Sequence, residues 1–180
     1  VSGGSFTFIK KLTASASATL SFVDGASDVV LDNTYKEYLF TYNNMHPETE
    51  SSFSVNFSVD SGSNYNVAKT TTLFRAYHLE DDSGAALDYE AGQDLAQGTG
   101  FQPIAQAVDD AVGDASASGY IHLFNPSSTT FVKHFFGSSQ YIYANTYCIQ
   151  EHFAGYGNTT SAIDAVQFKF ASDNIDAGDI

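Results

Sequence analysis

The chain has 180 residues, of which 43% are hydrophobic, and its 21 Asp and Glu outnumber 7 Lys and Arg to give a formal net charge of −14. This length is sufficient for one domain with a real core, and no break in composition argues for a second. The cations are scattered along the chain, so the sequence lacks the basic patch that would bind nucleic acid or an anionic membrane, and we expect neither partner. These cations are Lys10, Lys11, Lys36, Lys69, Arg75, Lys133 and Lys169.

Aromatic side chains dominate the apolar content, with 15 Phe and 11 Tyr against one Met and no Trp. Large planar side chains favour the pleated, half-buried surfaces of sheets. The polar residues are mostly Ser, Thr, Asn and Gly, which suit turns better than helices. The composition therefore predicts an all-β protein.

Alternation of apolar and polar residues predicts strands through the first 80 residues. The cleanest example is the set Phe53, Val55, Phe57 and Val59, which a strand would place on one face of a sheet. The region 65–79 resembles one long or bulged strand. We expect strands or extended pieces at 6–9, 20–22, 29–31, 35–42, 53–59 and 65–79.

Residues 85–118 have the least regular pattern and are rich in Ala, Gly, Gln and Asp. Ile104, Val108, Ala111 and Ala115 follow helical spacing, and Gly113 weakens it. We expect a long loop with at most a short helix here. Such an excursion either contacts a partner or is a loosely packed insertion, and the sequence does not separate the two.

Gly119–Phe136 predicts a β-hairpin at the centre of the fold. Two apolar runs flank a turn in which Asn125 and Pro126 precede four Ser and Thr residues. Further strands are expected at 141–149 and 163–170, followed by a polar tail from Ala171. The roughly eight to ten strands predict a single domain over 1–180, an antiparallel two-sheet β-sandwich of jelly-roll type with 85–118 as its one long irregular insertion.

Catalytic and metal-binding signatures are not found in the sequence. No G-x-S-x-G pattern provides a nucleophile, and the five histidines lack zinc spacing. His122 and His134 are the one pair that the hairpin would bring face to face, either as metal ligands or as strand histidines bonded to neighbours. We expect no enzyme activity and no cofactor, and the pattern assigns no binding residues.

Three acidic clusters raise calcium binding as an alternative to solvated loop charge, yet none has the D-x-[DN]-x-[DN]-G pattern. They are Asp81 and Asp82; Asp109, Asp110 and Asp114; and Asp173, Asp176 and Asp179. Facing carboxylates of a glycosidase are not excluded, but there is no Trp to form a sugar platform.

The single cysteine, one glycosylation pattern and the length of the apolar runs give no sign of a functional site. Cys148 lies in an apolar run and is expected to be a small buried residue. The Asn158 to Thr160 acceptor pattern is treated as coincidence, because the N-terminus lacks the order of a secretory signal. No apolar run reaches the length of a membrane span.

Five long strings in the chain resemble a family of small structural proteins of tailed phages, especially phages of marine bacteria. The strings are TYKEYLF (34–40), NMHP (44–47), GSNYNVAKTTTLFRAYH (62–78), GYIHLFNPSSTTFVKHF (119–135) and AGYGNTTSAIDAVQFKF (154–170). The family offers no catalytic residues to carry over. Its members usually continue, after a segment like 174–180, into a last Lys-Leu-Tyr-Gly strand, so the resemblance leaves the pairing of the final strand open.

The resemblance implies a virion protein on the outer surface of the head or tail. The first hypothesis is a capsid decoration or cement protein that contacts other virion proteins and forms a symmetric homo-oligomer such as a trimer. The second is a tail fibre or appendage that touches a host receptor. A carbohydrate-binding β-sandwich module, which would recognise a host surface glycan, is the alternative from another class.

Overall fold

Strands account for all the regular structure that the computed structural model describes, in residues 6–111, 113–144 and 146–180. The first five residues of the predicted 1–180 domain, together with Val112 and Asn145, lie outside this description. Within the described ranges, no helix has the length and apolar character that crossing a bilayer requires.

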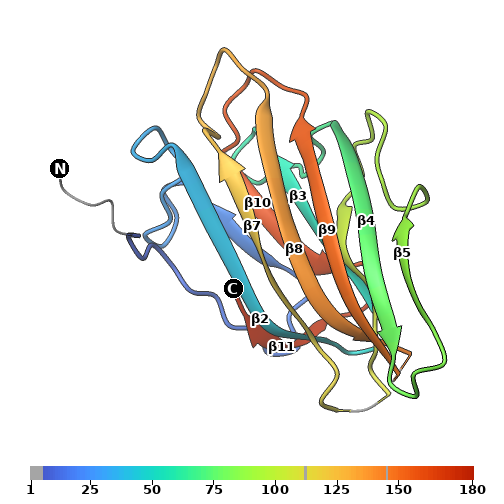
Figure 1. Cartoon of the computed structure of the whole chain (residues 1–180). Coiled ribbons are helices and arrows are strands. Elements are labelled where there is room, and N and C mark those ends of the chain that lie inside the picture. Colours follow the sequence, from blue (N-terminus) through green and yellow to red (C-terminus); the bar gives the residue numbers. More distant parts are fainter. Residues whose placement is uncertain (1–5, 112, 145) are drawn as a thin grey trace.

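Two antiparallel sheets pack against each other, with the larger sheet in front in Figure 1. The four-stranded sheet has the order β1 (Leu20–Val23), β10 (Ala165–Phe170), β3 (Ser51–Ser58) and β6 (Gln102–Val108). The seven-stranded sheet has the order β11 (Ile175–Asp179), β2 (Glu37–Pro47), β7 (Ala117–Phe124), β8 (Lys133–Tyr143), β9 (Tyr147–Gly157), β4 (Lys69–Leu79) and β5 (Ala85–Tyr89). This arrangement confirms the predicted all-β sandwich. The central hairpin is also confirmed, because β7 pairs with β8 in register from Ala117 opposite Tyr141 to Leu123 opposite Phe135.

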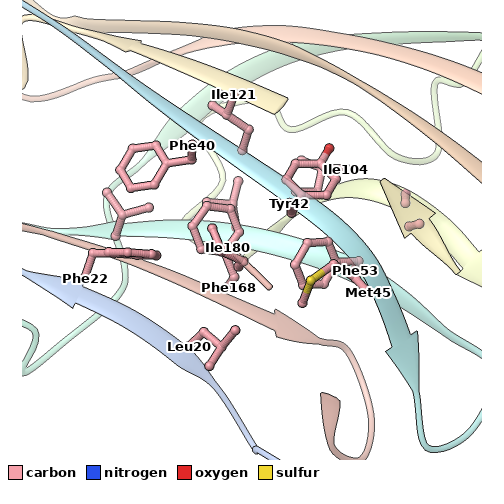
Figure 2. Close-up of a cluster of buried hydrophobic side chains, with 14 of the residues drawn as sticks. Leu20, Phe22, Phe40, Tyr42, Met45, Phe53, Ile104, Ile121, Phe168 and Ile180 are labelled. Atoms are coloured by element: carbon pink, nitrogen blue, oxygen red, sulfur yellow. The ribbon is translucent and has the colours of Figure 1, made fainter. Parts of the chain in front are cut away.

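An aromatic layer between the sheets forms the core (Figure 2). Phe53 stacks on Phe168 with ring centroids 5.9 Å apart, and both belong to the four-stranded sheet. From the facing sheet, Tyr42 meets Phe53 edge-on at 5.4 Å and Phe40 meets Phe168 at 5.7 Å. Side chains of this size each contribute roughly 1.5 to 3 kcal/mol when fully buried, so this layer is a major source of stability.

Close packing over the large sheet requires a residue without a side chain opposite one core ring. Gly137 of β8 is such a position, with the ring of Phe153 above it. A Cβ at this residue would lie 2.5 Å from Cζ of Phe153 and closer still to the carbonyl oxygen of Tyr120. The Tyr120 carbonyl cannot move away without disturbing the ladder between β7 and β8.

Residues 85–118 differ from the expected loop or short helix, because they contain β5, β6 and the start of β7. In β6, Ile104, Gln106 and Val108 are all buried, which is the period of a strand. The pattern was missed because Gln106 is polar. Nε2 of Gln106 donates to Glu151 inside the sandwich. The buried position is therefore occupied by a polar residue, and the apolar alternation is interrupted there.

Three other expectations need correction. Residues 6–9 are not in a strand, and the region 141–149 is the end of a hairpin between β8 and β9 rather than one strand. The polar tail contains β11, because its backbone pairs with β2 while most of its side chains remain exposed or half-buried. Edge strands of this kind need little apolar content, so alternation does not reveal them.

Substitution of Gly137 by Ala tests the close packing over β8. We expect the free energy of unfolding to fall by about 1 to 3 kcal/mol, the usual range for overpacking a core, as measured by chemical denaturation. Gly100→Ala is the matched control, since a Cβ there meets nothing within 4 Å. Equal stability of the two variants would contradict the proposed packing.

Candidate interaction surface

The outward side of the seven-stranded sheet carries a cluster of aromatic and histidine side chains. Strand alternation that buries one set of residues turns the neighbouring set outward. In β8, for example, Phe135 is buried while Phe136 is 44% exposed. We call the outward set the aromatic face; it consists of Phe74, Tyr120, His122, Phe124, Phe136 and His152.

The rings of the aromatic face form two stacked groups. Across β7 and β8, His122 stacks on Phe136 at 5.1 Å, and Phe124 stacks on Phe136 at 5.5 Å. Across β9 and β4, His152 stacks on Phe74 at 5.2 Å. Because these rings support one another, they form a fixed surface with little side-chain entropy to lose on binding.

A shallow hollow lies between the two stacked groups. It has a volume of about 220 Å³ and is lined by Phe74, Phe136, His152 and neighbouring residues, including Ala154. Ala154 sits directly opposite Phe136 in the ladder, so the small side chain leaves the space that the large ones flank. The hollow is open and suits one inserted side chain or ring rather than an enclosed substrate.

Charge is almost absent from this side of the sheet, although the protein is strongly acidic. The outward positions of β2, β7, β8, β9, β4 and β5 include one carboxylate, Glu37, and no Lys or Arg. Glu37 itself bonds Nδ1 of His122. The surface is therefore a neutral, aromatic area on a protein with a net charge of −14, and such areas mark interaction sites.

The dimensions of the sheet fit a protein interface. Five spacings of about 4.8 Å across the six strands, and a length of about 36 Å for the 11-residue strands, give an area of at most roughly 850 Å². A standard interface buries about 800 Å² on each partner. In Figure 1, none of the described segments crosses the near side of β2, β7, β8, β9 and β4, which leaves this area open.

A second cluster of polar groups is enclosed between the sheets. Glu151 of β9 is fully buried, and its Oε2 accepts hydrogen bonds from the hydroxyl of Tyr141 at 2.8 Å and from Nε2 of Gln106 at 3.2 Å. Its Oε1 has no hydrogen-bond partner among the residues described. Burial raises the pKa of Glu151 to about 7, against the opposing effects of these hydrogen bonds and of Arg75. The group has no exposed surface, so we assign it to the core.

Two buried lysines flank Gly157 in the large sheet. Nζ of Lys69 donates to Oδ1 of Asn56 at 2.5 Å and to the carbonyl of Val67 at 2.7 Å, and burial lowers its pKa to about 7. Nζ of Lys133 donates to the carbonyls of Phe131 and Thr159, and burial lowers its pKa as well. Through these hydrogen bonds to loop carbonyls, both lysines hold neighbouring loops against the end of the sandwich.

The predicted histidine pair is not brought together. His122 lies opposite Phe136, and His134 lies opposite Tyr156. No group of three or more His, Cys, Asp or Glu side chains in the described ranges is arranged to hold a metal ion.

Two further single-residue expectations have clear outcomes. Asp179 of the last acidic cluster is engaged by Lys11 at 2.9 Å and by Thr13 at 2.5 Å. Cys148 is exposed, which corrects the expectation of burial, because Ile149 takes the inward position next to it.

The aromatic face was missed at the level of sequence, although its signal is present. Phe135 and Phe136 are adjacent, and Tyr120, His122 and Phe124 alternate with Ile121 and Leu123. Strands that are aromatic on both sides indicate either a fully buried sheet or an outward binding surface. Pairing partners are needed to decide between them.

Comparison of the chain with family models, curated proteins and solved structures gives no match.

Glu151 makes stability depend on pH in a defined window. Its pKa is raised in the folded state, so the folded protein favours the protonated form. The contribution of Glu151 to stability is therefore fully present below the ordinary pKa of 4.5 and is lost as the pH rises through about 7. Between pH 4.5 and 7.5, the raised pKa of Glu151 should lower the free energy of unfolding of wild type by roughly 3 kcal/mol. This decrease should be absent from Glu151→Gln, as measured by denaturant titration at each pH. Glu80→Gln, at an exposed position, should show the same dependence of the free energy of unfolding on pH as wild type. An unchanged slope in Glu151→Gln would show that Glu151 titrates normally.

Proposed function

We propose that the protein is a non-enzymatic structural component of a phage virion, located on the outer surface of the particle as a capsid decoration or cement protein. Its aromatic face docks onto other virion proteins. The resemblance of five long sequence strings to phage structural proteins supports the virion setting. The neutral, open face supports the docking role.

The observation that carries this proposal is the contrast between the aromatic face and the rest of the surface. An acidic surface keeps copies of a protein apart in solution, whereas a side of the sheet with almost no charge, of at most roughly 850 Å², favours close contact. Aromatic residues, Phe among them, are enriched at interfaces, and here the rings of Phe74 and Phe136 are already fixed by stacking. The shifted carboxyl and amino groups lie inside the sandwich, which favours binding over catalysis.

The hollow beside Ala154 favours one alternative. Aromatic rings that flank a shallow depression provide a stacking surface for a sugar, and a tail appendage with this surface would bind a glycan receptor on the host. The hollow lacks a carboxylate lining, and Thr72 and His152 are its polar side chains. Glycan binding by the isolated protein, measured by calorimetry against host surface polysaccharide, would favour this alternative.

An electron cryo-microscopy map of the intact particle tests the proposal. We expect density for this sandwich at repeated positions on the capsid lattice, with the aromatic face turned toward the capsid. Density along the tail alone would support the appendage alternative. Absence of the protein from the particle would contradict the virion assignment.

Phe136→Asp tests the docking face directly, because it places a charge at the centre of the aromatic face. We expect at least roughly 30-fold weaker binding to particles that lack the protein, measured by co-sedimentation, as for loss of a central interface residue. Phe131→Asp is the control: Phe131 is 69% exposed and lies in the β7–β8 loop, outside the face. If both variants bind like wild type, the aromatic face is not the docking surface.

A further inference from the structure

Histidines are concentrated on the same side of the seven-stranded sheet as the aromatic face. Four of the five histidines of the chain occupy outward strand positions there: His78 in β4, His122 in β7, His134 in β8 and His152 in β9. The fifth, His46 of β2, contacts the carbonyl oxygen of Ala115 through Nδ1 at 2.6 Å. Because the outward positions of β2, β7, β8, β9, β4 and β5 include no Lys or Arg, histidines are the side chains that can give this side a positive charge.

Three of these histidines surround Phe136. His122 lies opposite Phe136 in the β7–β8 ladder and stacks on its ring at 5.1 Å. His134 precedes Phe136 by two residues on β8, so both side chains point to the same side. His152 lies opposite Ser138 in β9, diagonal to Phe136, and both rings line the hollow. Diagonal neighbours in a sheet are about 7 to 8 Å apart, so a partner that covers Phe136 also covers the three imidazoles.

Few charges can balance an imidazolium at these positions. Glu37 bonds Nδ1 of His122 and would balance a proton taken up there. His152 faces the ring of Phe74 at 5.2 Å, and His134 faces the ring of Tyr156 at 6.3 Å. Neither of these two histidines has a carboxylate among its described neighbours on this side of the sheet.

The other titratable groups at the outward positions of these strands add no carboxylate. They are His78, Tyr89, Tyr120, Cys148 and Tyr156. His78 lies four residues from Phe74 along β4, away from Phe136, and its Nε2 contacts Asp82 at 3.2 Å. The charge of the area around Phe136 is therefore controlled by its three histidines and by Glu37.

We propose that acidification releases the protein from its docking partner, because the imidazoles around Phe136 must be neutral when the aromatic face is covered. This switch rests on the docking role proposed above. Protonation of the four outward histidines, against the one carboxylate of Glu37, changes the charge of this side from −1 to +3. A covered imidazolium loses its water, and at His134 and His152 no carboxylate of the same side replaces that water.

The size of the effect follows from proton linkage. A free imidazole has a pKa of about 6.5 and is about nine-tenths protonated at pH 5.5. Each such group that must be neutral in the complex weakens binding about tenfold at that pH. The two histidines without a carboxylate neighbour, His134 and His152, thus set an effect of roughly 100-fold. His122 adds less, because Glu37 remains beside it when the face is covered.

Co-sedimentation of the intact chain with particles that lack the protein, at pH 7.5 and at pH 5.5, tests the switch. The readout is the ratio of the dissociation constant at pH 5.5 to that at pH 7.5. We expect a ratio of at least about 30 for wild type. His134→Gln with His152→Gln should reduce the ratio to below about 3, because glutamine is uncharged at both pH values. His134→Gln alone keeps the stack of His152 on Phe74 and should reduce the ratio about tenfold.

Two controls separate the histidines around Phe136 from other effects of acid. His78→Gln removes a histidine from the same side but away from Phe136, and it should keep the wild-type ratio. All variants experience the same change in the charge of the particle and of the acidic surface, so a difference between their ratios isolates the substituted histidines. Binding should return when the pH is brought back to 7.5, and circular dichroism should show folded protein at pH 5.5.

Equal wild-type binding at the two pH values would overturn the switch and leave the docking proposal standing. Stronger binding at pH 5.5 would also overturn it, and would indicate an acidic partner surface. A wild-type ratio that His134→Gln and the double variant both retain would overturn it as well, because the pH dependence would then arise elsewhere. Absence of wild-type binding at pH 7.5 is a different result, since it contradicts the docking role itself and the switch with it.

Discussion

The contacts of Phe53 with Tyr42 and of Phe168 with Phe40 hold the two sheets together, and the rest of the molecule depends on them. They join the centre of the small sheet to β2 of the large sheet and so fix which residues of β2 face inward. The ladder from β2 through β7 to β8 carries the same alternation across the sheet. Since Phe135 is held inward beside Phe57 at 5.2 Å, Phe136 must point outward. The packing of the buried aromatic residues thus determines which aromatic side chains of the large sheet point outward.

Charge is distributed unevenly over the surface of this sandwich. Carboxylates are nearly excluded from the outward positions of β2, β7, β8, β9, β4 and β5, while the protein as a whole carries a net charge of −14. Repulsion between acidic surfaces opposes non-specific association, and the neutral face is the place where contact meets least opposition.

Sequence alone was sufficient for the fold class and for the strands with strong alternation, such as β3 and the β7–β8 hairpin. It failed where burial is polar, as at Gln106 of β6, and where backbone pairing acts without apolar side chains, as in β11. The aromatic face could not be assigned, because alternation shows that Phe136 and His122 share a side but not that this side is open.

The most direct test of the central claim, that the aromatic face is the contact surface, is hydroxyl-radical footprinting of the protein free and bound in the particle. Phe74, Tyr120, Phe136 and His152 should be oxidised in the free protein and protected in the particle. Phe131, exposed outside the face, should react in both states. Equal oxidation of Phe74 and Phe136 in the two states would show that this side of the sheet remains open to solvent, and the account of docking would be wrong.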